Sequence, residues 1–220
     1  GFKNRIINGA MVIDQRNAGA AWGTSINGYT VDRWIAFQAL STGKLNGGQN
    51  YNSITPPTGF LNYVGFQSQS AYSVGALDYY SFAQYIEGFN TADLGFGTAS
   101  ASTVTLSFWV RSSLTGTFGG ALRNSAATRS YPFTYTINAA NTWEQKSITV
   151  AGDTSGTWIG ATNGIGLAIF FGLGVGSTYS GTAGAWASAN YGSATGATSV
   201  VGTNGATFYI TGVQLEKGST

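Results

Sequence analysis

The chain has 220 residues, of which 43% are hydrophobic and only 8% are charged, and its formal net charge is +2. Soluble proteins carry about 25% charged residues, so this surface must consist mostly of neutral polar groups and glycine, of which there are 33. The hydrophobic content excludes a disordered chain. The Lys and Arg residues are scattered and form no basic stripe, so we expect no nucleic-acid partner.

The chain contains no cysteine and no histidine. This composition excludes disulfides, zinc-thiolate sites, cysteine nucleophiles and imidazole general bases. No apolar run approaches the roughly 20 residues that span a bilayer, so we expect no membrane insertion. The glycine-rich segments do not match the phosphate-binding pattern GxxxxGK[ST], and we expect no cofactor.

The first expected elements lie near the N-terminus. In residues 2–14 (FKNRIINGAMVID), the turn signal Asn8-Gly9 separates two short apolar runs. This pattern predicts a strand, a turn and a second short strand. Residues 15–28 predict a loop that carries one aromatic residue, Trp22.

The next segment, residues 29–38 (YTVDRWIAFQ), favours a strand, although two alternation registers compete and leave its buried face open. We expect the neighbouring Asp32 and Arg33 to form a structural ion pair. Residues 40–59 are rich in Gly and Asn and contain two consecutive prolines, which predicts a long irregular loop. Residues 60–74 predict one or two short strands.

Two segments in the middle of the chain show strong period-two alternation. Residues 79–88 (YYSFAQYIEG) favour a strand over a helical turn because of their aromatic density. Residues 103–113 (TVTLSFWVRSS) give the clearest strand, with Trp109 and Arg111 on its wetter face. The predicted buried positions are Tyr80, Phe82, Gln84 and Ile86 in the first segment and Val104, Leu106, Phe108 and Val110 in the second.

The remaining strands are expected in the second half. Residues 133–138 and 143–150 predict two strands that pair with each other across a short loop. Residues 165–173 (IGLAIFFGL) are apolar on both faces, which is typical of a central strand covered on both sides. The last strand, residues 206–216, changes its alternation phase at Gly212, which predicts a bulge.

Together these segments predict roughly nine to eleven short strands and no helix with a 3.6-residue apolar pattern. We therefore expect an all-β fold, a single antiparallel jelly-roll β-sandwich over residues 1–220 with long Gly/Ser/Thr-rich loops.

The sequence does not favour catalysis. A glycosidase needs two carboxyl groups that face each other roughly 5 to 10 Å apart, and no two of the eight acids share a predicted strand face. A serine nucleophile would lack an imidazole base, and no motif suggests assistance by lysine. We predict that the chain is not an enzyme.

Aromatic residues in loops are the better candidates for a site. Sugar rings stack on Trp and Tyr, while Asn, Gln and Arg bond to hydroxyl groups. A loop aromatic can instead pack beneath its own loop or serve a subunit interface. Trp186 is the first candidate for a glycan platform, and Trp186→Ala is predicted to weaken glycan binding without unfolding the chain. The full candidate set is Trp186, Tyr179, Tyr191, Trp158 and Trp22.

Three parts of the chain carry a family resemblance: NRIINGAMVIDQR with YTVDRW, the block YIEGFNTADLGFGTASASTVTLSFWVRSSLTGTFGGALRNS, and GATFYITGVQLEKGS. They resemble jelly-roll domains in tail-fibre-type proteins of bacteriophages and prophages. The resemblance covers nearly the whole chain. It implies a C-terminal module of a longer virion protein that binds host cell-surface carbohydrate from the particle surface. It also implies a homotrimer with other virion proteins as partners.

The layout is also similar to galactose-binding-like carbohydrate-binding modules. Those modules often hold a structural calcium between an N-terminal NG-x-F-E segment and a pair of acids in the closing strand. Here residues 10–12 follow Asn8-Gly9 without an acid, and Thr211 and Gly212 stand where the acids would be. Calcium prefers carboxylate ligands, so we expect no metal site.

Two other classes of function remain open. The first is a capsid decoration, cement or head-fibre structural protein, because a neutral, glycine-rich sandwich could clamp neighbouring subunits. Its location on the virion would distinguish it from a tail-fibre module. The second is a glycan depolymerase, which would release oligosaccharides from host polysaccharide.

Overall fold

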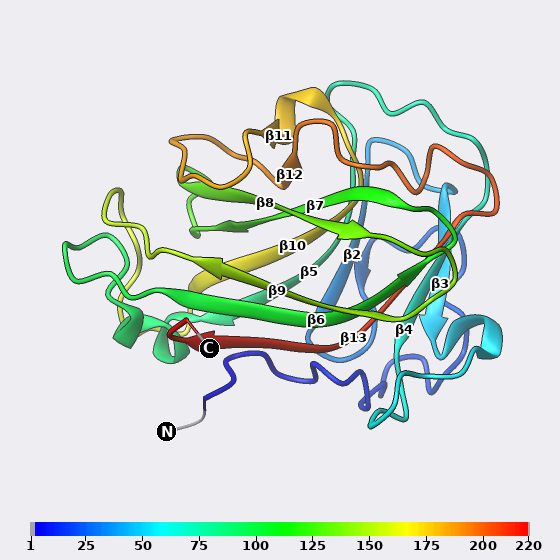
Figure 1. Cartoon of the computed structure of the whole chain (residues 1–220), viewed down its shortest axis with the longest axis horizontal. Helices are drawn as coiled ribbons and strands as arrows, with labels where there is room; N and C mark the ends of the chain where they lie inside the picture. Colours follow the sequence, from blue (N-terminus) through cyan, green and yellow to red (C-terminus); the bar gives the residue numbers. More distant parts are fainter. Residues whose placement is uncertain (1–2, 220) are drawn as a thin grey trace.

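The computed structural model describes residues 3–219, which form two antiparallel sheets packed face to face. The six-stranded sheet has the order β1-β2-β5-β10-β7-β8, and the five-stranded sheet has the order β3-β4-β13-β6-β9. In Figure 1, β6, β9 and β13 lie below β7, β8 and β10, with the core between them. The predicted all-β jelly-roll sandwich is confirmed.

The strands of the six-stranded sheet are β1 (Gly28–Tyr29), β2 (Trp34–Ala39), β5 (Tyr79–Glu87), β7 (Gly116–Arg123), β8 (Ser130–Ile137) and β10 (Ile165–Val175). Those of the five-stranded sheet are β3 (Leu45–Gln49), β4 (Val64–Ser68), β6 (Val104–Ser112), β9 (Glu144–Val150) and β13 (Thr207–Lys217). A two-stranded parallel ladder, β11 (Ser180–Gly181) and β12 (Ser193–Ala194), lies above β8 in Figure 1. The helical segments described are short 3-10 turns: Tyr51–Ser53, Gly88–Asn90, Ala92–Leu94 and Ser177–Tyr179. Over residues 3–219, no helix is long and apolar enough to cross a bilayer.

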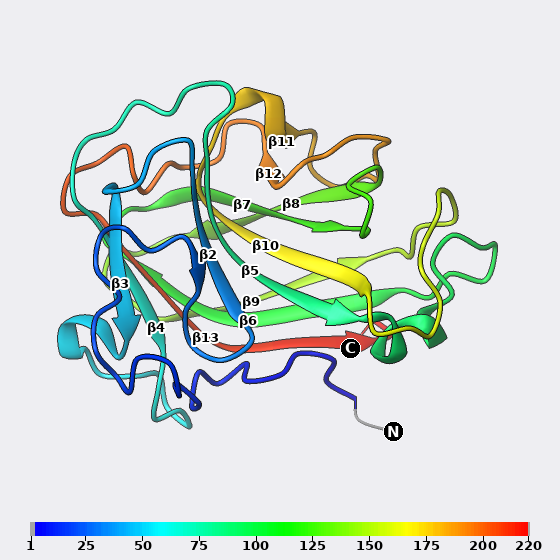
Figure 2. The same ribbon diagram turned by 180° about the vertical axis from the view of Figure 1, so that it is seen from behind.

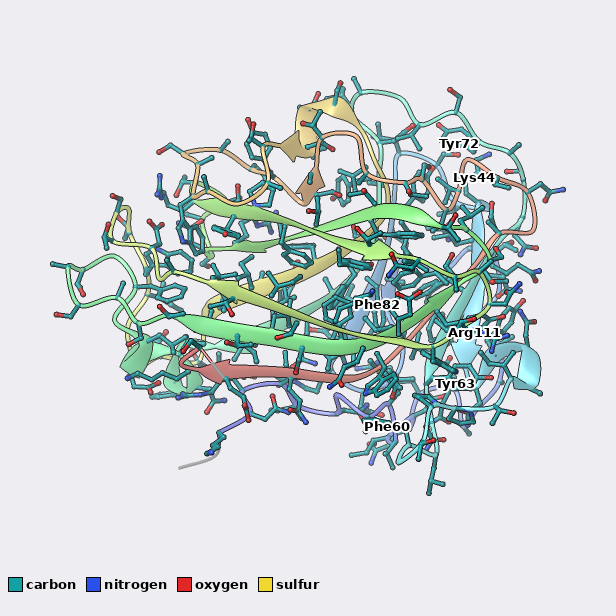
Figure 3. The ribbon with its side chains drawn as sticks, in the orientation of Figure 1. Lys44, Phe60, Tyr63, Tyr72, Phe82 and Arg111 are labelled. Carbon is teal, nitrogen blue, oxygen red and sulfur yellow. The ribbon has the colours of Figure 1, made fainter. Side chains whose placement is uncertain are left out.

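The core forms where the alternating strands predict it. The predicted inward residues of β5 and β6 are all buried, which confirms both strands and their registers. Figure 3 shows Phe82 between the two sheets, where its ring stacks on Trp34 with centroids 4.7 Å apart. Trp34 also decides the open register of β2, because its complete burial places Phe37 on the opposite face. Each such large side chain contributes about 1.5–3 kcal/mol through burial.

The predicted pairing of residues 133–138 with residues 143–150 is wrong. β8 pairs with β7 in one sheet, whereas β9 pairs with β6 in the other. The chain therefore crosses from one layer to the other between Ile137 and Glu144. The Glu144 carboxylate accepts hydrogen bonds from the backbone N–H groups of Asn138 and Ala139, and these bonds hold the crossover. β8 and β9 each have one apolar face, and the crossover lets these two faces contact the same core from opposite layers.

The predicted N-terminal strands are also absent over the described part of residues 2–14, and residue 2 lies outside that part. Asn8 and Met11 take positive φ angles of 55° and 58°, which break an extended chain. The segment instead runs beside the second half of β13, where Asn4 and Glu216 form a β-bridge. β4 pairs only with the first residues of β13. The N-terminal segment therefore lies along the remaining residues of that same edge of β13.

The predicted long loop over residues 40–59 contains a strand that sequence reasoning missed. β3 has the sequence LNGGQ, and its Asn and Gly residues have low strand propensity. The contact geometry explains the glycine, because a Cβ atom on Gly47 would lie 2.9 Å from the Trp22 ring. β3 pairs with β4 at the edge of the five-stranded sheet.

The predicted bulge at Gly212 is confirmed by a register shift between Thr211 and Gln214 in the pairing of β13 with β6. Gly212 has a φ of 61°, and a Cβ atom there would lie 2.6 Å from the Phe60 ring. Gly212→Ala is therefore expected to lower the free energy of unfolding by about 1–3 kcal/mol. Urea denaturation measures this change.

Gly160→Ala is the matched control for Gly212→Ala. A Cβ atom on Gly160 would meet no heavy atom within 4 Å, and its φ lies outside the left-handed region. Equal stability of the two variants would contradict the explanation of the bulge.

Candidate functional site

The outer face of the six-stranded sheet carries an apolar cluster that lies outside the core. Ala83, Ala168 and Phe170 are buried there, and Phe37 and Tyr85 pack against them. Successive strand residues point to opposite faces, so these side chains turn away from the second sheet. Figure 2 shows the strands that carry them, β2, β5 and β10, nearest the viewer. The sequence predicts that the β10 segment is covered on both sides. On this outer face the cover consists of neighbouring side chains of the same sheet, whereas on the inner face it is the second sheet.

Aromatic rings wall a pocket of about 130 Å³ on this face. Phe37 lies 5.9 Å from Tyr79 and 6.3 Å from Phe170, measured between ring centroids. Tyr179 contacts Tyr79 edge to face at 5.3 Å and closes one end. The full lining comprises Phe37, Tyr79, Ser81, Tyr85, Arg123, Phe170, Tyr179, Asn190 and Gly192.

Small residues hollow the sheet beneath these rings. Ser81 of β5 lies opposite Phe37 of β2 on one side and Gly172 of β10 on the other. Ala83 lies opposite Phe170 in the next outward row. A row that alternates large and small side chains leaves space between the rings, so the sheet pairing itself makes the depression.

Arg123 of β7 brings a positive charge to the pocket. Its guanidinium carbon lies 4.5 Å from the centroid of the Phe170 ring, a cation–π contact. Its Nη1 donates a hydrogen bond of 2.8 Å to Oδ1 of Asn190. Burial lowers the pKa of Arg123, and Tyr85 and Tyr79 partly oppose that shift. Burial likewise raises the pKa of the Tyr85 hydroxyl.

A second hollow of about 560 Å³ adjoins the pocket, because Tyr85 lines both. We call the two hollows together the outer groove. Arg16 and Tyr29 both line the second hollow, and the Arg16 guanidinium carbon lies 5.2 Å from the centroid of the Tyr29 ring. The other residues of this hollow are Asp32, Arg33, Ile86, Glu87, Asn163, Gly164 and Ile165.

The predicted ion pair between Asp32 and Arg33 is wrong. Arg33 instead pairs with Glu87 of β5 and donates a hydrogen bond of 3.1 Å to the backbone carbonyl oxygen of Tyr85 on the same strand. The hydrogen bond from Arg33 holds the pKa of the Glu87 carboxyl below its usual value, in spite of burial. Asp32 instead accepts a hydrogen bond of 2.7 Å from the backbone N–H of Gln15. Over residues 3–219, no cluster of three or more acidic side chains offers a metal site.

The candidates predicted from loops fall into two groups. Tyr179 lines the outer groove, whereas Tyr191 packs over Gly181, where an added Cβ would lie 2.3 Å from the tyrosine ring. Tyr191 nevertheless stands between Asn190 and Gly192, which both line the pocket. The Gly-rich segment that contains β11 and β12 therefore contributes one of its two predicted tyrosines, Tyr179, to the lining of the pocket.

The tryptophan candidates make contacts within the protein. Trp158 and Trp186 meet edge to face at 5.4 Å, and both contact Phe96. The indole N–H of Trp186 donates to the carbonyl oxygen of Ala151 at 2.7 Å. Trp22 packs edge-on against a core phenylalanine at 5.3 Å. This geometry favours a loop-anchoring role for Trp158 and Trp186, and a glycan platform at these residues stays a prediction.

Sequence reasoning missed the strand residues of the outer groove. Phe37, Tyr85 and Phe170 lie in alternating segments, and such aromatic residues are expected in a core. A signal was present, because Tyr79 and Tyr85 have the opposite parity to the buried Tyr80. Arg123 could not be found in this way, since nothing local to it indicates that Phe170 is its neighbour.

The outer face of the five-stranded sheet is filled at one end by the chain itself. Figure 3 shows Phe60, Tyr63 and Arg111 gathered at this end. The Asn52 amide donates to the Tyr209 hydroxyl at 3.0 Å, and the Trp143 indole donates to a carbonyl of the same segment. These contacts tie residues 50–62 over the sheet, which leaves the outer groove as the better candidate site.

No protein-family model and no curated protein matches the sequence. Solved structures nevertheless share the fold. A putative sugar binding protein from Bacteroides thetaiotaomicron is 12% identical with a TM-score of 0.55, over 98% of this chain and 100% of that chain. The enzymatically active domain of tailspike protein 4 from bacteriophage CBA120 is also 12% identical, with a TM-score of 0.51. That match covers 97% of this chain and 21% of the tailspike chain, so this chain spans about a fifth of it. At such identities the similarity shows a shared jelly-roll β-sandwich fold.

Proposed function

We propose that this chain is a non-catalytic saccharide-binding module whose ligand lies in the outer groove. One observation carries the proposal: aromatic rings and a few polar groups meet in a hollow on the outer face of the six-stranded sheet. Sugars need this combination, because their C–H faces stack on rings while their hydroxyl groups need bonding partners. The shared fold with a putative sugar binding protein supports the proposal.

The state of the acids supports binding over hydrolysis. A glycosidase needs one carboxylic acid whose pKa is raised, so that it can protonate the leaving group. In the outer groove, Arg33 lowers the pKa of Glu87 instead. A carboxylate that is held ionised serves as a hydrogen-bond acceptor for sugar hydroxyl groups.

We place this module on a bacteriophage tail fibre or a similar appendage, as the C-terminal part of a longer virion protein. The fold shared with a phage tailspike domain supports this location, and so does a surface with little charge. A homotrimer would multiply weak binding at each site, provided that the sites engage together. Light scattering checks the trimer, and antibody labelling of particles distinguishes a tail from a capsid location.

Tyr85→Ala tests the groove, because Tyr85 is the residue that lines both of its hollows. We expect affinity for the bound saccharide to fall roughly thirtyfold, which corresponds to about 2 kcal/mol for a central aromatic contact. A glycan array selects the saccharide, and calorimetry measures its affinity for each variant.

Phe89→Ala is the matched control, because Phe89 is an aromatic residue that is 66% exposed and lies outside the groove. Its affinity is expected to equal that of the parent protein. Unchanged affinity in folded Tyr85→Ala, shown by a native circular dichroism spectrum, would remove the outer groove from the proposal.

A further inference from the structure

The pocket of the outer groove contains a cation without a counter-ion. The cations that pair with a carboxylate within 4.0 Å are Arg5, Arg33, Arg129, Lys146 and Lys217. Arg123 has no such partner among residues 3–219, although it lines the pocket and touches Phe170. Its one hydrogen bond to a side chain goes to the neutral Asn190.

Burial makes this arrangement unfavourable in the absence of a ligand. Nε of Arg123 is buried and has no hydrogen-bond partner within the described chain. A desolvated charge usually has an ionic partner, because the cost of desolvation is otherwise uncompensated. The lowered pKa of Arg123 has the same cause, since burial disfavours its charged form. The Phe170 ring compensates only in part.

We propose that the outer groove selects saccharides that carry an anionic group, for which Arg123 supplies the counter-charge. The inference rests on the proposed saccharide-binding function and narrows its ligand class. A guanidinium presents planar N–H donors that match the two oxygens of a carboxylate, so a uronate fits this position. The pocket of about 130 Å³ is smaller than the roughly 300–1,000 Å³ typical of larger ligands, and a single sugar unit suits it.

The adjoining hollow has a charge pattern that agrees with this proposal. It contains Arg16 and Arg33 against Asp32 and Glu87. With Arg123, the whole outer groove holds three arginines and two carboxylates. A polyanionic saccharide that continues from the pocket past Tyr85 therefore meets a net positive surface, which favours its association.

Matched polymers test the proposal. The probes are polygalacturonate, the same polymer with its carboxyl groups reduced to alcohols, dextran and dextran sulfate. Affinity electrophoresis is expected to show at least tenfold tighter binding to an anionic polymer than to its neutral counterpart. The comparison of polygalacturonate with dextran sulfate shows whether the pocket prefers a carboxylate or a sulfate as the anionic group. Arg123→Met is expected to lower the affinity for the anionic polymers roughly ten- to a hundredfold, as for a lost charge-assisted hydrogen bond, and so to remove the preference over the neutral polymers.

Arg111→Met is the matched control. Arg111 also has a buried Nε without a partner and no carboxylate within 4.0 Å over residues 3–219, but it lies on the five-stranded sheet. Its loss should leave the anionic preference unchanged, whereas Arg123→Lys should retain part of it. These results would support the inference.

Three outcomes would overturn it. Preference of the parent protein for the neutral polymers would reject the anionic ligand while the proposed saccharide binding stands. An equal loss of neutral and anionic binding in Arg123→Met would assign Arg123 a structural role. Failure of the folded parent protein to bind any of the four polymers would count against both the inference and the proposed function.

Discussion

Asparagine in place of Asp153 is expected to lower the free energy of unfolding by about 3–5 kcal/mol, the usual cost of breaking a buried ion pair. The Asp153 carboxylate is buried and accepts two hydrogen bonds of 2.7 Å from Arg129. It also accepts hydrogen bonds from the Ser155 backbone N–H and the Trp158 indole. Four donors thus converge on one side chain, and the NH₂ group of an asparagine amide could not accept any of them.

The same carboxylate makes stability depend on pH in the acid range. Burial raises the pKa of Asp153, but the hydrogen bonds from Arg129 and Ser155 prevail and hold the pKa below its usual value. The folded state therefore binds the proton less readily than the unfolded state does. This contribution is complete above the unfolded pKa and is lost as the pH falls through the folded one. The unfolding free energy of Asp153→Asn should change less over that range.

Asp93→Asn is the matched control for Asp153→Asn. Asp93 also receives two hydrogen bonds from one arginine, Arg5, but its side chain is 50% exposed. A solvated pair contributes about 0–1 kcal/mol, so this variant should stay close to the parent protein. Chemical denaturation at neutral pH compares the two, and equal losses would show that burial does not set the strength of the pair.

The second large effect is expected for Trp186→Ala, which should lower the free energy of unfolding by about 2–3 kcal/mol. This is somewhat less than the cost for a fully buried tryptophan. The ring contacts Phe96, Tyr131 and Trp158 within 6 Å between centroids. Its removal leaves a gap among these three aromatic rings and an unpaired carbonyl at Ala151. Thermal unfolding and calorimetry with the saccharide measure stability and affinity separately.

The same variant separates the two hypotheses for Trp186, because a glycan platform predicts weaker saccharide binding. If the ligand lies in the outer groove, the affinity of folded Trp186→Ala for saccharide is expected to stay within about twofold of the parent value, since Trp186 lies outside the residues that line that groove. Trp186→Phe separates packing from hydrogen bonding, since it keeps a ring and loses only the indole N–H, at a cost of about 1 kcal/mol. Unchanged stability with lost affinity would instead support Trp186 as the glycan platform.

Residues in the strands show which features of the fold can be predicted from the sequence. Phe108 lies between Leu106 and Val110, its neighbours two residues away on either side, and both are apolar. Its burial therefore follows from alternation alone. The phase change at Gly212 likewise reveals a bulge, because an extra residue must restore the buried face. In each case a short stretch of chain contains the whole signal.

The assembly of the strands could not be obtained in that way. Ile148 of β9 and Ile137 of β8 each mark an apolar face, but nothing near either residue states which layer its strand joins. The sequence of β3 does not indicate a strand at all. Gly47, whose missing side chain leaves room for the Trp22 ring, has a low strand propensity. Partner choice depends on how all the apolar faces fill one core together.

The amino-acid sequence by itself determined the class of fold, the buried faces of the main strands and the neutral character of the surface, because side-chain period and composition are local properties. Only the tertiary structure decided the site. Phe37, Tyr85, Arg123 and Phe170 come from four strands, β2, β5, β7 and β10, which are neighbours only in the order of the finished sheet. Strand order is set by global packing and long-range pairing, so the outer groove exists in the fold and in no single segment of the chain.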